Sequence, residues 1–262
     1  MKILGHRGAR AEHLENSQVG FEYVQKLAKK PLASNRNALA GIEFDVQLTA
    51  DGELAVFHDE NLRRLFKKQS RLDQLQFAEL SHHSKSQILP LSAMPDLLLG
   101  YQHIELEIKT HTRTPYSLLM QGLNESLSQY FTSLQPVLTI TTFDHELQYR
   151  MSIHPKISQW RRGLLVDKLD ADTVTKNDSV NATHASNQTF IDLAQKFGCR
   201  HISWHFKRVT KATIDACHRH GFTTSAWTVN DIDTAKHLSQ MGLDYVITDY
   251  PTLFLRLLPS SL

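Results

Sequence analysis

Cysteine, glycine, proline and long hydrophobic runs are all scarce in this sequence of 262 residues. The two cysteines, Cys199 and Cys217, form no C-x-x-C motif, which argues against a disulfide framework and leaves both as expected core residues. With only 11 glycines and 8 prolines, collagen-like repetition is excluded. No run reaches the roughly 18 apolar residues of a membrane-spanning helix, and the apolar stretch near the first residue is too short for a signal peptide. We therefore expect a cytoplasmic protein without a membrane span.

Charge of neither sign dominates the chain. Lysine and arginine number 29 against 27 aspartates and glutamates, a net charge of +2, so we do not expect a nucleic-acid partner. Hydrophobic residues make up 41% of the sequence, which excludes disorder as its main state. The length suits a single domain over residues 1–262, because α/β barrels commonly reach this size as one unit. None of these numbers predicts an oligomeric state.

Short apolar runs alternate with amphipathic stretches along most of the chain. The runs predict eight strands, at residues 2–4, 41–48, 103–108, 137–141, 163–166, 201–205, 223–228 and 245–248. The stretches between them predict helices at residues 18–29, 116–131, 145–154, 189–197, 210–220 and 231–241. This alternation predicts a parallel sheet of the α/β class, and about eight repeats in this length favour a closed (β/α)8 TIM barrel. No G-x-G-x-x-G follows the first strand, which argues against a dinucleotide-binding sheet.

A hairpin interrupts this alternation after the second strand. Asp51-Gly52 stands between two alternating apolar segments, and this dipeptide is a strong signal for a two-stranded turn. We therefore expect a small β-hairpin extension that returns His58 toward the rim of the barrel. Residues 67–95 are expected to form a small excursion, and the polar residues 175–189 a lip after the fifth strand.

Acidic residues concentrate on two neighbouring strands. Glu43 and Asp45 are two residues apart and therefore point to one face of their strand. Glu107, on the next strand in the predicted barrel, supplies a third carboxylate. Unpaired buried charges are very costly, so these oxygens predict one hard divalent cation. The alternative is a set of salt bridges to Arg7 or Lys109 without a metal.

The remaining candidates follow from the rule that barrel active sites lie at the carboxyl ends of the strands. His6 and His58 fall at such ends, and two imidazoles can serve as acid and base near neutral pH. Arg7 and Lys109 supply positive charge for an anionic substrate, as phosphoryl chemistry requires. Trp227 ends the seventh predicted strand, where it is either a core residue or an aromatic surface for a small alcohol.

Eight short strings in this order resemble the glycerophosphodiester phosphodiesterases. They are HRG (6–8), EN (15–16), E-x-D-V (43–46), T-x-DG (49–52), V-x-HD (56–59), E-I-K (107–109), WTVN (227–230) and TD-x-P (248–251). The resemblance implies a TIM barrel that hydrolyses glycerophosphodiesters to glycerol 3-phosphate and an alcohol with Mg²⁺ or Ca²⁺. It implies metal ligation by Glu43, Asp45 and Glu107, acid–base catalysis by His6 and His58, and phosphate binding by Arg7 and Lys109.

Some positions depart from the family pattern, and some questions stay open. The usual P-E-N-T is Leu-Glu-Asn-Ser at residues 14–17, and residues 62–66 read LRRLF where relatives approach D-R-T-T. The attacking group is either water or the glycerol 2-hydroxyl, and either histidine can be the base. Two other functions remain as alternatives: release of a head group from lysophospholipids, and binding of phosphodiesters without turnover.

Overall fold

The computed structural model describes residues 1–29, 39–167 and 186–258, and its centre is a closed barrel of parallel strands. Eight strands form the barrel: β1 (Lys2–His6), β2 (Gly41–Leu48), β4 (His103–Ile108), β5 (Leu138–Thr142), β6 (Arg161–Val166), β7 (His201–His205), β8 (Thr223–Trp227) and β9 (Tyr245–Thr248). They pair in the order β1-β9-β8-β7-β6-β5-β4-β2, and a parallel β1–β2 pairing closes the ring. The predicted (β/α)8 barrel is confirmed.

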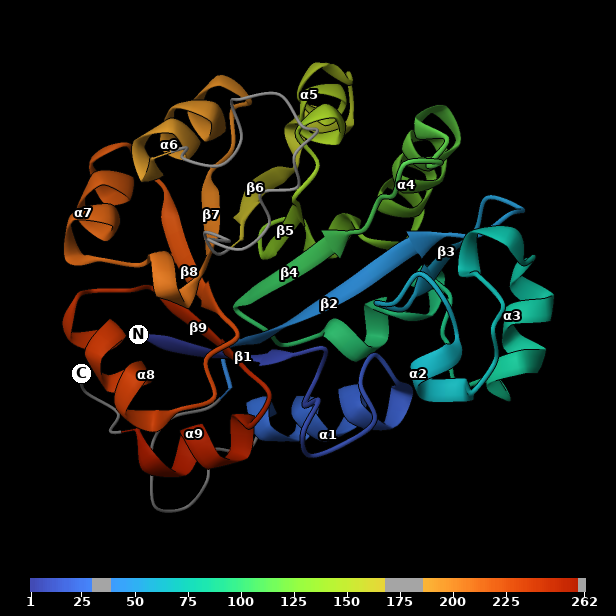
Figure 1. Cartoon of the computed structure of the whole chain (residues 1–262), viewed down its shortest axis with the longest axis horizontal. Coiled ribbons are helices and arrows are strands. Elements are labelled where there is room, and N and C mark those ends of the chain that lie inside the picture. Colours follow the sequence, from blue (N-terminus) through green and yellow to red (C-terminus); the bar gives the residue numbers. More distant parts are fainter. Residues whose placement is uncertain (30–38, 168–185, 259–262) are drawn as a thin grey trace, which may run out of the picture.

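Helices surround this barrel on the outside (Figure 1). They are α1 (Gln18–Lys29), α2 (Arg63–Phe66), α3 (Phe77–Ser84), α4 (Tyr116–Tyr130), α5 (His145–Ile153), α6 (Asn187–Lys196), α7 (Lys211–Arg219), α8 (Ile232–Gln240) and α9 (Pro251–Leu257). The six predicted helices are confirmed: α1 has the predicted ends, and the ends of the other five differ by at most two residues. The sequence interpretation missed α2, α3 and α9, which are all short. In the described part of the chain, no helix is both long enough and apolar enough to cross a membrane.

The predicted hairpin is present after β2. Strand β3 (Leu54–Val56) runs antiparallel to β2, with Val46 opposite Val56 and Leu48 opposite Leu54. Gly52 turns the chain with a φ of 89°, a backbone conformation that favours glycine. The turn therefore carries His58 back to the carboxyl end of the barrel.

The excursion between β3 and β4 has its own small apolar cluster. Leu62, Leu72, Leu80 and Ile88 are buried there together with the hairpin residue Phe57. Helices α2 and α3 lie beside β3, at one side of the barrel in Figure 1. The excursion thus begins before the expected residues 67–95. Of the expected lip at 175–189, residues 175–185 lie outside the described chain.

Strand β2 shows how the fold separates core from site. Its residues alternate, and Phe44 packs edge-on against Phe21 of α1 with ring centroids 5.9 Å apart. Glu43 and Asp45 therefore point the other way, into the barrel, as the period of a strand requires.

Both cysteines are buried and form no disulfide, as expected.

Candidate active site

A cavity of about 310 Å³ opens at the carboxyl ends of the barrel strands. Seven of the eight predicted site residues line it: His6, Arg7, Glu43, His58, Glu107, Lys109 and Trp227. The eighth, Asp45, is fully buried and contacts two of these residues, Arg7 and Lys109. The structure therefore brings all eight together from five separate regions of the sequence.

Three carboxylates form the acidic centre of the cavity. Each of Glu43, Asp45 and Glu107 offers one oxygen, and these oxygens lie within 4.8 Å of one another. Burial, together with the charges of Asp45 and Glu107, raises the pKa of Glu43 well above its usual value. Burial also raises the pKa of Glu107, to about 7. Two of the three groups thus resist ionisation as the site stands, which is the behaviour of a cluster with too little positive charge.

Arg7 and Lys109 supply the positive charge that the cluster has. Arg7 Nε lies 3.2 Å from Asp45 Oδ2, and Lys109 Nζ lies 3.3 Å from Asp45 Oδ1 and donates to Glu107. Burial opposes ionisation of Asp45, but the charges of Lys109 and Arg7 hold its pKa well below its usual value. The salt bridges considered as an alternative to a metal are therefore present. They leave the cluster short of positive charge, because the pKa values of Glu43 and Glu107 stay raised in their presence.

His6 is held by the carboxylate of Asp249, which directly follows strand β9. Its Nδ1 lies 2.6 Å from Asp249 Oδ1, and its Nε2 lies 3.8 Å from Glu43 Oε2. Burial lowers the pKa of His6, although the hydrogen bond to Asp249 opposes the shift. An ionised Asp249 can only accept, so Nδ1 carries the proton and the neutral ring presents an unprotonated Nε2 to the cavity.

His58 forms a second pair of the same kind. Its Nδ1 lies 2.7 Å from Asp59 Oδ1. Burial lowers the pKa of His58, with the positive charges of Lys109 and Arg7 acting in the same direction. The cavity thus contains two imidazoles, each oriented by an aspartate, as acid–base chemistry requires.

Three residues that hold this site were given no role by the sequence interpretation: Glu15, Arg64 and Asp249. Arg64 donates to both oxygens of Glu15 at 2.6 Å and to Asp59 at 2.6 and 3.1 Å. Burial alone would raise the pKa of Glu15, but hydrogen bonds from Arg64 and the charge of Arg7 lower it to about 2. Glu15 and Asp249 stand in the strings EN and TD-x-P, which marked their positions without indicating their contacts.

Trp227 forms part of the wall of the cavity. Its Nε1 donates to the carbonyl of Ser203 at 3.3 Å, and its ring meets Phe143 edge-on at 5.5 Å. The neighbouring Asn230 donates to Asp249 Oδ2 at 2.7 Å. Trp227 is half-buried: it packs against a small cluster of buried apolar residues and also lines the cavity, to which it offers an apolar face.

These features define an enzyme of the TIM-barrel class, with a cavity for a small molecule at the carboxyl ends of the strands. A family model described as the glycerophosphoryl diester phosphodiesterase family matches residues 6–253. The chain therefore belongs to the glycerophosphoryl diester phosphodiesterase family, and the enzyme class predicted from its motifs is confirmed.

Individual relatives agree with this assignment. A Bacillus altitudinis protein named glycerophosphodiester phosphodiesterase is 23% identical over 265 residues, which are 95% of each chain. A phosphodiesterase of Oleispira antarctica, solved with its product sn-glycerol-3-phosphate, is similar with a TM-score of 0.75. That match has 20% identity and covers 98% of this chain and 96% of the other, and it supports the fold. A human lysophospholipase D is 32% identical over 79 residues, which are 30% of this chain and 22% of that protein.

Proposed function

We propose that this chain hydrolyses glycerophosphodiesters to glycerol 3-phosphate and an alcohol, and that it requires one divalent cation. One observation carries the proposal: a cluster of three carboxylates lies in the same cavity as two histidine–aspartate pairs. A phosphodiester needs charge neutralisation at its phosphate, a base for the attacking group and an acid for the leaving group. We propose that residues 1–262 form one domain with this activity.

Glu43, Asp45 and Glu107 would hold the cation. Their oxygens lie within 4.8 Å of one another, and carboxylate oxygen is the ligand that Mg²⁺ and Ca²⁺ prefer. The buried Asp45 Oδ1 has an ion pair with Lys109 at 3.3 Å but accepts no hydrogen bond in the described structure, so it keeps lone pairs for such an ion. When bound, the cation supplies positive charge next to a phosphate oxygen.

Arg7 and Lys109 would bind the other phosphate oxygens, since both line the cavity beside the carboxylates. His6 Nε2 would take the proton from the attacking oxygen, either of water or of the glycerol 2-hydroxyl. His58, protonated at Nε2, would give its proton to the departing alcohol as the P–O bond breaks. With water as the attacking group, His6 then releases its proton to solvent and His58 takes one up, so protons balance over the cycle. With the 2-hydroxyl, the first step forms a cyclic phosphate, which water must open to give glycerol 3-phosphate. In that second step His58 would take the proton of water and His6 would return its proton to the 2-oxygen. Trp227 would pack against the glycerol carbons.

The experiment is an assay for glycerol 3-phosphate released from glycerophosphocholine and glycerophosphoethanolamine in the presence of Mg²⁺ or Ca²⁺. We expect turnover of at least one of these substrates. Folded protein that binds the cation but turns over neither substrate would contradict the proposal.

A second candidate is release of choline from lysophosphatidylcholine by the same residues. The similarity of one segment to the human lysophospholipase D favours testing it. Faster release of choline from lysophosphatidylcholine than of glycerol 3-phosphate from glycerophosphocholine would make this second function the principal one.

A further inference from the structure

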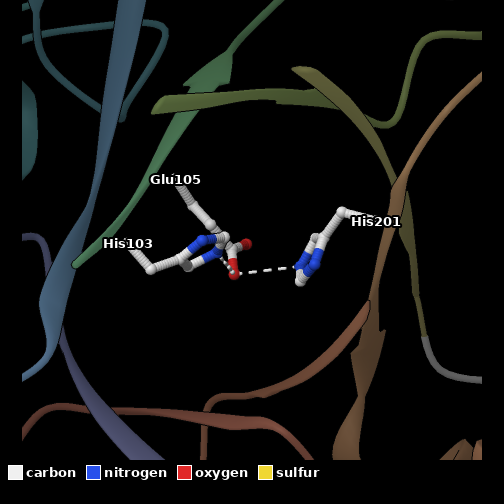
Figure 2. A group of neighbouring side chains, drawn as sticks. All are labelled: His103, Glu105 and His201. Carbon is white, nitrogen blue, oxygen red and sulfur yellow. Dashed lines mark hydrogen bonds and ion pairs between the residues drawn. The ribbon is translucent and has the colours of Figure 1, made fainter. Parts of the chain in front are cut away.

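A second cluster of polar side chains lies inside the barrel, below the active site. His103 and Glu105 come from β4 and His201 comes from β7. Figure 2 shows their polar atoms converging across the interior of the barrel. All three residues are at most 1% exposed, so no solvent screens their charges.

The distances within this cluster are long for charge-assisted hydrogen bonds. Glu105 Oε1 lies 3.3 Å from His103 Nε2 and 3.1 Å from His201 Nε2, whereas N–H donors approach a carboxylate to about 2.7–2.9 Å. Two ligands at about 2.0–2.1 Å from a tetrahedral metal ion stand about 3.3 Å apart. The three ligand atoms also lie within 4.8 Å of one another. The distances between these nitrogen and oxygen atoms thus fit a metal ion bound by all three residues better than hydrogen bonds between them.

The surroundings hold the imidazoles as metal ligands are usually held. His201 Nδ1 lies 2.8 Å from Thr223 Oγ1, while its Nε2 lies 3.1 Å from Glu105 Oε1 and 3.0 Å from Ser225 Oγ. The Tyr245 ring stacks on His103 with centroids 4.1 Å apart and fixes the plane of that imidazole. A partner on the second ring nitrogen, as Thr223 is for His201, orients histidines around metal ions.

Glu105 gives an independent indication of a ligand. Its Oε2 is buried and has no hydrogen-bond partner in the part of the chain that the structure describes. A buried acceptor left without a partner is costly, more so when it carries charge. A cation bound by both oxygens of Glu105 would satisfy this one as well.

We propose that His103, Glu105 and His201 form a zinc site that is separate from the carboxylate cluster of the active site. Two histidines and one glutamate are a known ligand set of Zn²⁺, with a fourth position for water. Glu105 precedes Glu107 by two residues on one strand face, so the two sites are about 7 Å apart. Paired ions of two-metal catalysis lie only about 3.5–4 Å apart. The zinc would therefore join β4 to β7 and stabilise the barrel, without taking part in phosphate chemistry.

The test is the metal content of the purified chain, grown with zinc and dialysed against excess Mg²⁺ to fill the carboxylate cluster. We expect the wild type and Glu43→Gln to retain about one zinc ion per chain, and His201→Gln and His103→Gln to retain none. Glu43→Gln is the matched control because it removes a charge from the other cluster. Wild-type protein without zinc would overturn the proposal, and so would zinc lost from Glu43→Gln but kept by His201→Gln.

Two further measurements do not depend on the folding of the histidine variants. X-ray absorption of the wild-type zinc protein should show two imidazole nitrogens at about 2.0–2.1 Å; a shell of oxygen alone would overturn the proposal. Thr223→Val removes the hydroxyl that contacts His201 Nδ1 and also accepts from Arg161, and it should weaken zinc binding roughly 10- to 100-fold. Unchanged affinity in this variant would contradict the orientation assigned to His201.

Discussion

Asp249→Asn tests how the structure prepares His6 for catalysis. Asp249 accepts two hydrogen bonds on separate oxygens, from His6 Nδ1 at 2.6 Å and from Asn230 Nδ2 at 2.7 Å. An asparagine has one acceptor for these two donors, so one buried donor would face an NH₂ group. Losing such a charged hydrogen bond costs about 1.5–3 kcal/mol, which corresponds to a fall in kcat of roughly 10- to 150-fold.

The pH dependence of the Asp249→Asn variant gives a second readout. Burial lowers the pKa of His6, and the hydrogen bond and charge of Asp249 oppose that shift. Removing the charge therefore lowers the pKa of His6 further. A base is active when it is unprotonated, so the acidic limb of the kcat/KM profile should move to lower pH.

Asp244→Asn is the matched control for this prediction. Asp244 directly precedes β9 and Asp249 directly follows it, and Asp244 also pairs with a histidine, with 2.9 Å between its Oδ2 and His218 Nε2. It does not line the cavity, so its variant should keep the wild-type kcat and pH profile. Steady-state kinetics on glycerophosphocholine checks both variants. Asp249→Asn with kcat within twofold of the wild type would refute the role assigned to the His6–Asp249 pair.

Three other perturbations follow from the same geometry. Glu43→Ala should abolish turnover that depends on Mg²⁺ and weaken calorimetric Mg²⁺ binding, because two carboxylates under-coordinate the ion; unchanged binding would refute the ligand assignment. His58→Ala should reduce kcat by about 10²- to 10⁴-fold. The loss should be smallest on substrates whose leaving group needs no proton, and an equal loss on all substrates would contradict the role of His58 as acid. The low pKa of Glu15, about 2, contributes stability that is present above about pH 4.5 and is lost as the pH falls toward 2. Arg64→Met should therefore shift acid unfolding, followed by circular dichroism, to higher pH, and an unshifted midpoint would contradict this account.

The barrel and the carboxylate cluster were predictable because local patterns determine them. Alternating apolar runs place strands, and the two-residue spacing of Glu43 and Asp45 directs both side chains inward. The Asp51-Gly52 turn predicted the hairpin and hence the return of His58 to the rim. The short helix α9 was missed, since its seven residues give too little periodicity to separate a helix from a strand.

The supporting contacts of the site were not predictable, because they join residues distant in the chain. His6 meets Asp249 across 243 positions and Arg64 meets Glu15 across 49. The spacing of neighbouring residues in the sequence cannot indicate contacts over such separations. The same holds for the contact of His201 with His103 and Glu105, since β4 and β7 are not neighbours in the barrel. Only the closed ring brings their side chains together.

The most direct test of the proposed function is the rate of glycerol 3-phosphate release from glycerophosphocholine before and after removal of metal. Wild-type protein is treated with EDTA, dialysed, and assayed again with Mg²⁺ or Ca²⁺ restored. We expect activity to be lost in EDTA and recovered with the cation. Without the cation, the positive charges beside the three carboxylates of the active site are too few to balance them. Full activity in EDTA would contradict the assignment of this cluster as the metal site.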